Sequence, residues 1–229
     1  FFFQADDGIR DSVASRGLGD VYKRQSGVTV IGILGGIGSG KSLVAEILLQ
    51  MGADIFSADD VGHQLLDDPL VREQLLSRWG DGILTTDGHP DRKAIAAQVF
   101  QGPNAKNELA FLEQLTHPRI GQELEVFIQQ VQQRHDLRLA VIDAALLLEA
   151  GWETACDELL FVEVDAETRW ERCQERGWSR EQWEAREASQ RSLEEKRGRA
   201  SLVVDNNSDE CALQSHLHEI FGDRVRLDS

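Results

Sequence analysis

The stretch GILGGIGSGKSLV, residues 32–44, holds five glycines in thirteen positions and continues a run of apolar residues. Glycine loses more conformational freedom on folding than any other residue, so this cluster predicts a backbone that turns tightly or lets a ligand approach closely. Residues 35–42, GGIGSGKS, match the pattern G-x-x-x-x-G-K-[ST] of a phosphate-binding loop. In such a loop successive backbone N–H groups face an anion, and the N-terminus of the following helix adds its positive dipole.

The residues on both sides of this loop have the patterns that a phosphate-binding loop requires. Residues 28–34, VTVIGIL, have the composition of a buried strand. Val44, Ile47, Leu48 and Met51 then recur at the spacing of one helix face. A glycine-rich turn followed by a chance Lys-Ser pair is the alternative, but it has no need of a strand before it and a helix after it. We therefore expect a nucleoside triphosphate to bind here with Mg²⁺.

Individual residues of the loop have expected roles in nucleotide binding. Lys41 can reach the outer phosphates, and the Ser42 hydroxyl can coordinate Mg²⁺. The expected nucleotide-binding residues of the loop and the helix start are Gly36, Ile37, Gly38, Ser39, Gly40, Lys41, Ser42 and Leu43.

Length and composition limit the class of protein. The 229 residues are 41% hydrophobic and 28% charged, which is typical of one soluble globular domain, expected over residues 26–229. A formal net charge of −16 argues against a nucleic-acid partner, because phosphate backbones attract basic surfaces. No apolar run reaches the length of a membrane span, and three widely spaced cysteines without a C-x-x-C pattern indicate reduced thiols in the cytoplasm. Residues 1–25 show neither helical nor strand periodicity, and we expect a leader that is non-native or disordered.

The rest of the chain alternates between strand and helix patterns. Four further segments read as short strands: residues 53–60, 137–144, 157–165 and 200–207. A long helix is expected to have Pro118 in its first turn. The alternation predicts an α/β fold of the P-loop NTPase type, with a five-stranded, mostly parallel sheet flanked by helices.

Two charged, helical segments are expected to leave this core. The core segments are residues 26–60, 116–165 and 200–229. In a small-molecule kinase one such segment holds the acceptor and the other closes over the phosphates. We call residues 61–115 the acceptor-binding excursion and residues 166–199 the lid. The base-reading motif N-K-x-D of GTPases is absent, which disfavours a GTPase switch.

Two acidic positions are candidates for chemistry. Asp59 is expected where the second strand ends, at the edge of the sheet that faces ligands, and its carboxylate could accept the proton of an attacking hydroxyl. A helix cap is the alternative for Asp59, and a cap or a solvated role is favoured for Asp60. Asp143 is expected at the end of a strand beside the loop strand, where it could hold a Mg²⁺-bound water or be an ordinary strand-end carboxylate. The same two roles are open for Glu149.

Basic residues supply candidates for anion contacts. Arg92 and Lys93 open a helix that Asp91 can cap, and cations at that end suggest an anionic ligand, although a solvated helix start is as plausible. Arg169, Arg172 and Arg176 share one helix face. Lid arginines can stabilise a transferring phosphoryl group, and a solvated face with weak ion pairs is the alternative.

Several longer stretches resemble one family of kinases, in order and spacing, over residues 28–221. They are VIGILGGIGSGKSLVAEILLQMGADIFSADDVGHQLL (30–66), DRKAIAAQVF (91–100), LTHPRI (115–120), LLLEAGWETACDELLFVEVD (146–165), RCQERGWSREQWEAREASQ (172–190) and KRGRASLVVDNN (196–207). The chain is thereby similar to the dephospho-coenzyme A kinases. The resemblance implies transfer of the γ-phosphoryl group of ATP to the ribose 3′-hydroxyl of dephospho-coenzyme A, the last step of coenzyme A synthesis.

The phosphate-loop motif, the local patterns and the resemblance together give expected roles for individual residues. Those expected to be catalytic are Lys41, Asp59 and Arg176. Those expected to bind ATP, beyond the loop, are Arg172 and Asn206, the latter near the adenine. Those expected to contact the acceptor are His63, Arg92, Lys93 and His117, although a helix-capping role is equally plausible for His117. Those expected at Mg²⁺ are Ser42 and Asp143.

The chain departs from the family pattern at Ser57, His63, Ala145, Leu148 and Ser201. None of these positions lies in the phosphate-binding loop, so the departures bear on the acceptor pocket rather than on the reaction. A kinase of another nucleoside, nucleotide or small alcohol is the nearest alternative, and a non-catalytic nucleotide-binding module is the alternative from another class. The sequence carries no signal of oligomeric state.

Overall fold

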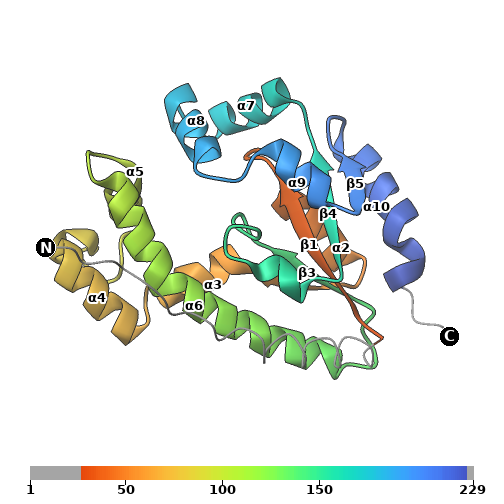
Figure 1. Ribbon diagram of the computed structural model, residues 1–229, viewed down its shortest axis with the longest axis horizontal. Coiled ribbons are helices and arrows are strands. Elements are labelled where there is room, and N and C mark those ends of the chain that lie inside the picture. The colour runs from red at the N-terminus through yellow and green to blue at the C-terminus, as the bar shows by residue number, and fades with distance from the viewer. Residues whose placement is uncertain (1–26, 226–229) are drawn as a thin grey trace, which may run out of the picture.

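A parallel sheet forms the centre of the molecule in a computed structural model that describes residues 27–225 (Figure 1). Its strands are β1 (Thr29–Gly35), β2 (Asp54–Ser57), β3 (Leu139–Asp143), β4 (Glu158–Glu163) and β5 (Leu202–Asp205). The strand order is β2-β3-β1-β4-β5, and each neighbouring pair is parallel. The predicted five-stranded α/β fold is confirmed, whereas the predicted leader, residues 1–25, lies outside the described residues.

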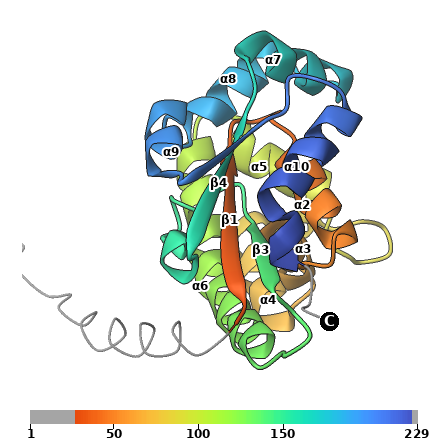
Figure 2. The ribbon, with the colours of Figure 1, turned by 90° about the vertical axis from the view of Figure 1, so that its right-hand side faces the viewer.

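Helices follow most strands and cover both faces of the sheet. They are α2 (Lys41–Gln50), α3 (Ala58–Leu65), α4 (Pro69–Trp79), α5 (Arg92–Phe100), α6 (Ala105–Gln132), α7 (Ala166–Glu175), α8 (Arg180–Ala188), α9 (Leu193–Arg199) and α10 (Glu210–Val225), with short 3₁₀ turns at η1 (Asp81–Ile83) and η2 (Trp152–Ala155). Side chains of α2 and α10 pack with alternate strand residues into one apolar core, and side chains of α6 and α9 pack on the opposite face (Figure 2). No helix among residues 27–225 is long and apolar enough to cross a membrane.

The acceptor-binding excursion has a small apolar core of its own. Leu66, which follows α3, and residues of α4, η1 and α5 build it: Val71, Leu75, Ile83 and Ile95. Figure 1 shows α4 and α5 on the left, beyond the end of the sheet, and the lid helices α7 and α8 above the sheet. The two segments therefore extend from the sheet in different directions.

Two boundaries expected from the sequence were wrong. The second strand ends at Ser57 rather than near Asp60, because the Ser57 hydroxyl accepts the Asp60 N–H at 3.2 Å and caps α3. Pro118 lies inside α6 rather than in its first turn. The helix continues through the proline because buried residues on both sides of it, including Thr116, Ile120 and Leu124, belong to one packed face.

The strand register places the ends of β1, β2 and β3 at one edge of the sheet. Asp143 of β3 is paired with Ile33 of β1 on one side and with Ser57 of β2 on the other. The loop after β1, the end of β3 and the start of α3 therefore meet at the carboxyl edge of the sheet, where open α/β sheets bind ligands.

Candidate active site

The phosphate-binding loop connects β1 to α2 with the backbone that its glycines permit. Gly38 and Gly40 have φ values of 82° and 87°, in the left-handed region that favours glycine. Added Cβ atoms would lie 2.4 Å from the Arg169 carbonyl oxygen and 2.5 Å from the Asn206 Nδ2, respectively. These two positions therefore require glycine for two reasons: the backbone conformation, and the close packing of Arg169 and Asn206 against the loop.

Lys41 is folded back onto this loop. Its Nζ donates to the carbonyl oxygens of Gly35 and Gly36 at 3.3 and 3.2 Å. Burial lowers the pKa of Lys41 from 10.5 to about 8, and the charges of Asp143 and Asp59 oppose this shift only in part. A phosphate at the loop would supply the negative charge that this ammonium lacks.

Two predicted carboxylates lie at the same place. Burial raises the pKa of Asp143, opposed by a hydrogen bond from the Ser42 side chain and by the charge of Lys41. The charges of Asp59 and Asp60 raise that pKa further. Asp59 lies in the first turn of α3 and exposes its side chain. Lys41, Ser42, Asp59 and Asp143 therefore form one electrostatically coupled group.

The oxygens of this group suit a magnesium ion. Mg²⁺ prefers carboxylate and hydroxyl oxygens, and it usually keeps waters and substrate phosphates as further ligands. Ser42 and Asp143 are in hydrogen-bond contact, so one ion could be shared between their oxygens. Residues 27–225 contain no cluster of three or more His, Cys, Asp or Glu side chains placed to hold a metal ion.

Side chains of the lid helix α7 contact the backbone of the phosphate-binding loop. Arg172 donates to the Asn206 carbonyl at 2.8 Å and to the Gly38 carbonyl at 3.5 Å. The buried Asn206 side chain donates to the Ser39 carbonyl at 2.8 Å. These contacts with the loop backbone are what the structure provides for Arg172 and Asn206, while their contacts with ATP stay predictions.

Arg169 has a structural position that the sequence did not reveal. Its side chain is 4% exposed, donates to the Ile37 carbonyl and pairs with Glu187 of α8. The pattern placed Arg169 on the arginine face of the lid helix without a role. The only sequence signal was its spacing of three residues from Arg172, which places the two side chains on the same face of the helix.

A cavity of about 460 Å³ opens above this group. Its floor includes the loop, Lys41, Asp59 and Asp143. The acceptor-binding excursion contributes Phe100, Leu109 and Glu113, and the lid contributes Arg176, Trp178, Arg186, Ser189 and Gln190. Segments that are far apart in the sequence thus surround one space, and the predicted catalytic residues Lys41, Asp59 and Arg176 all line it.

The four residues predicted to contact the acceptor lie outside the cavity lining. His63 is exposed on α3, and Arg92 and Lys93 are exposed at the N-terminus of α5, which Asp91 caps as expected. His117 is inside α6, so it is not a helix cap, and its ring meets the Trp152 ring edge-on at 5.6 Å. Burial lowers the pKa of His117. Acceptor contact by these four stays a prediction.

A buried lysine on α9 is a further site residue that no pattern singled out. Lys196 is 2% exposed, and its Nζ donates to the Gln190 side chain at 2.8 Å. The Glu149 carboxylate lies 3.7 Å from the same Nζ and accepts the Arg191 N–H at 2.7 Å. The lid therefore joins the core through a largely buried charged pair, and this pair is hydrogen-bonded to Gln190, which lines the cavity.

The departures from the family pattern have ordinary structural places. Ser57 caps α3, and Ala145 lines the cavity. Leu148 is buried in the apolar core, and the Ser201 hydroxyl accepts the Leu159 N–H at 3.4 Å. Only Ala145 therefore touches the space that a substrate would occupy.

Comparison with known proteins gives a consistent result. The family model described as dephospho-CoA kinase matches residues 29–211. The dephospho-CoA kinase of Geobacter sulfurreducens is 37% identical over 199 residues, covering 86% of this chain and 99% of the relative. The dephospho-CoA kinase of Symbiobacterium thermophilum is 40% identical over 180 residues, covering 77% of this chain and 73% of the relative. The crystal structure of TT1252 from Thermus thermophilus superposes with a TM-score of 0.70 and 30% identity, covering 87% and 99% of the two chains.

Proposed function

Because the chain belongs to the dephospho-CoA kinase family, we propose that it transfers the γ-phosphoryl group of ATP to the ribose 3′-hydroxyl of dephospho-coenzyme A, giving coenzyme A and ADP. This is the last step of coenzyme A biosynthesis. The observation that carries the proposal is the meeting of Lys41, Asp59 and Arg176 at one cavity beside the phosphate-binding loop. The family assignment supplies the acceptor, and the cavity supplies the groups that phosphoryl transfer requires.

Lys41 and Arg176 are proposed to stabilise the transferring phosphoryl group. The charge on its equatorial oxygens must be balanced in a site shielded from water, where each cation acts strongly. The ammonium of Lys41 now donates to two carbonyls of the loop, which are weaker acceptors than phosphate oxygens. Nucleotide binding would therefore draw Lys41 from these carbonyls to the phosphates.

Asp59 is proposed to receive the proton of the 3′-hydroxyl. Its carboxylate lines the cavity and is exposed to it, as a general base must be. Ser42 and Asp143 are proposed to hold Mg²⁺, which when bound would neutralise phosphate charge. Arg172 and Asn206 are proposed to complete the ATP site through the loop that they brace.

The acceptor is proposed to enter between the excursion and the lid. On this view residues 61–115 receive dephospho-coenzyme A, residues 166–199 close over the phosphates, and the remaining segments from residue 26 onward are the core. His63, Arg92, Lys93 and His117 would then contact parts of the acceptor remote from the reacting hydroxyl, since they lie outside the cavity lining. A cytoplasmic location agrees with three widely spaced cysteines without a C-x-x-C pattern.

A phosphotransfer assay tests the proposal. The protein is incubated with Mg-ATP and dephospho-coenzyme A, ADP is followed, and the product is identified by mass spectrometry. We expect coenzyme A phosphorylated at the 3′ position, and a loss of turnover of about 100-fold or more in Lys41→Ala with unchanged circular dichroism. Phosphorylation of a different acceptor from a panel of nucleosides and small alcohols would replace the proposed substrate. ATP binding without any product would indicate a non-catalytic module.

A further inference from the structure

One guanidinium joins the acceptor-binding excursion to the lid. The Arg186 guanidinium carbon lies 4.1 Å from the ring centroid of Phe100 and 4.1 Å from that of Trp178. Phe100 ends α5 in the excursion, whereas Trp178 precedes α8 in the lid. All three side chains line the cavity. Arginine stacks well on aromatic faces, so this sandwich is an attractive contact between two segments that must both close around a substrate.

The stack leaves the charged edge of Arg186 available. Two aromatic rings lie against the guanidinium, whereas its five N–H donors lie in the plane of the group. No carboxylate oxygen within residues 27–225 lies within ion-pair distance of it, although most arginines of the lid have such a partner. Burial lowers the pKa of Arg186, because the half-buried charge has no compensating anion. An arginine held in a cavity wall without an anion is arranged to receive one.

We propose that Arg186 binds a phosphate group of the acceptor and that Phe100 and Trp178 hold its guanidinium in place for this contact. The inference rests on the proposed function and names a residue of that same site. The acceptor is favoured over ATP for two reasons. The triphosphate is received by the loop and by Lys41, whereas one half of the stack belongs to the excursion predicted to hold the acceptor. Phe100 is therefore a positioning residue that acts through Arg186.

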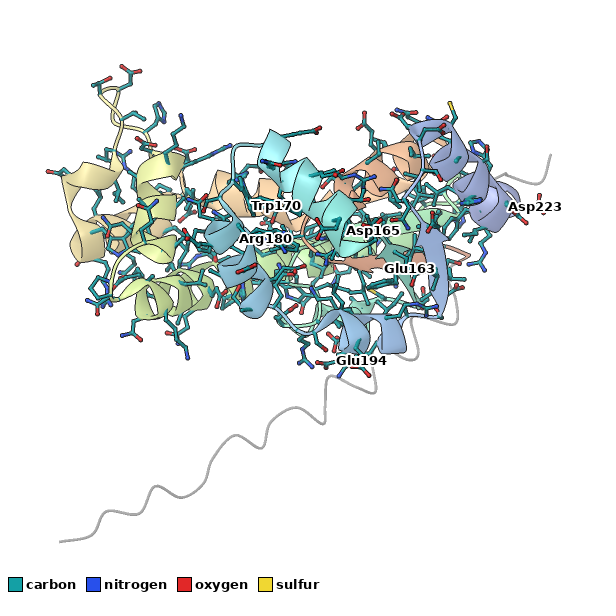
Figure 3. All side chains as sticks on the ribbon, turned by 90° about the horizontal axis from the view of Figure 1, so that it is seen from above. Glu163, Asp165, Trp170, Arg180, Glu194 and Asp223 are labelled. Carbon is teal, nitrogen blue, oxygen red and sulfur yellow. The ribbon has the colours of Figure 1, made fainter. Side chains whose placement is uncertain are left out.

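Arg180 supplies a matched control on the same helix. Its guanidinium carbon lies 5.1 Å from the Trp170 ring and 4.8 Å from the Trp183 ring, so it too stacks on two aromatic side chains. It is paired with Glu184, and it does not line the cavity. Figure 3 shows Trp170 and Arg180 close together on the lid helices. Arg180→Ala therefore removes a stacked lid arginine and its ion pair with Glu184 without removing any side chain from the cavity lining.

The test measures binding of each substrate separately. Dissociation constants for dephospho-coenzyme A and for Mg-ATP are determined by titration calorimetry for Arg186→Ala, Phe100→Ala, their double variant and Arg180→Ala, together with kcat and KM. We expect Arg186→Ala to weaken dephospho-coenzyme A binding by about tenfold or more, the effect of losing a charged hydrogen bond. Phe100→Ala should weaken it by about threefold to tenfold, and ATP binding should change by less than about twofold in both. Phe100 is 43% exposed, so its truncation leaves the apolar cores intact.

The double variant decides whether the two residues act together. If Phe100 works through Arg186, the double variant binds dephospho-coenzyme A no more weakly than Arg186→Ala alone, and Arg180→Ala behaves like the original protein. Losses that multiply, an unchanged Arg186→Ala, or an equal loss of ATP binding would each overturn the inference. If the original protein neither binds nor phosphorylates dephospho-coenzyme A, the proposed function fails and this inference fails with it. That result differs from an active protein whose variants are unaffected.

Discussion

Replacing Lys196 by methionine removes the one cation in the buried pair that joins the lid to the core. The Lys196 and Glu149 side chains are 3% and 18% exposed, and their charged atoms lie 3.7 Å apart. Burial lowers the pKa of Lys196, and the charge of Glu149 opposes that shift. Methionine keeps the length and apolar stem of lysine, so the substitution tests charge and hydrogen bonding rather than volume.

The expected loss of stability depends on the contacts that Glu149 retains after the substitution. Breaking a buried pair by removing one partner costs about 3–5 kcal/mol, because the other charge stays buried. Glu149 retains the Arg191 N–H and some exposure, while its second carboxylate oxygen has no hydrogen-bond partner within the described residues. We therefore expect a lower loss, about 2–3 kcal/mol in the free energy of unfolding. For a chain of this size that corresponds to a fall in Tm of about 4–12 °C.

Urea unfolding followed by tryptophan fluorescence measures this loss. The variants are Lys196→Met, Glu149→Gln and the double variant, in which a neutral amide faces an apolar side chain and at least about 1 kcal/mol should be recovered. Arg197→Met is the matched control on the same helix, because its pair with Glu163 is exposed at 47% and 53% and should contribute less than about 1 kcal/mol. The reasoning is refuted if Lys196→Met costs no more than Arg197→Met, or if the losses in the double variant simply add.

Three further predictions concern Asp59, Lys41 and Gly40. Asp59→Asn should lower kcat by about 100-fold or more, since it removes the proposed general base, while the calorimetric Kd for Mg-ATP changes by less than about threefold; equal losses in both would make Asp59 structural. Activity and stability should respond to alkaline pH in opposite directions. The kcat/KM for ATP should fall above pH about 8 as Lys41 of the free enzyme loses its proton. The contribution of Lys41 to unfolding free energy should instead rise between pH about 8 and 10.5, where the unfolded chain binds more protons than the folded one. A kcat/KM profile that stays flat to pH 10 contradicts the lowered pKa. Gly40→Ala should abolish measurable ATP binding in calorimetry, because its Cβ would lie 2.5 Å from the Asn206 amide, whereas Gly52→Ala, also at positive φ but with nothing within 4 Å, should lower only Tm.

The phosphate-binding loop was predictable because its determinants are neighbours in the sequence. The glycines, Lys41 and Ser42 lie within a few positions, and the strand and helix on either side have regular apolar periods. The parallel sheet followed from the alternation of strand and helix patterns. The placement of Asp143 beside the loop strand also followed, since a buried apolar segment had to occupy a central strand.

The two incorrect boundaries arose where a local signal competed with packing. Ser57 could end a strand or cap a helix, and only the hydrogen bond to Asp60 decides between them. Pro118 is a common first-turn residue, yet a continuous buried face holds α6 together across it. In both cases propensity was weaker than the tertiary contacts of neighbouring residues.

The buried charges near the site and the long-range contacts of the cavity lining could not be derived from the sequence, because charged residues look alike until the fold buries some of them. Arg169 and Lys196 lie in a segment whose other charges are mostly exposed, and no period separates the buried two from the rest. The contact of Arg186 with Phe100 spans 86 positions, and neither residue type demands the other. Long-range pairs of this kind depend on how the excursion and the lid approach each other, which no single segment encodes.

The gathering of cations at this cavity explains how an acidic chain can bind polyanions. The net charge of −16 repels nucleotides at long range, so attraction must come from the site itself. The charges of Lys196 and Arg169 lower the pKa of Lys41 further, and the charges of Asp143 and Asp59 compensate only in part. A bound phosphate relieves this repulsion among the cations and the desolvation of Lys41 together.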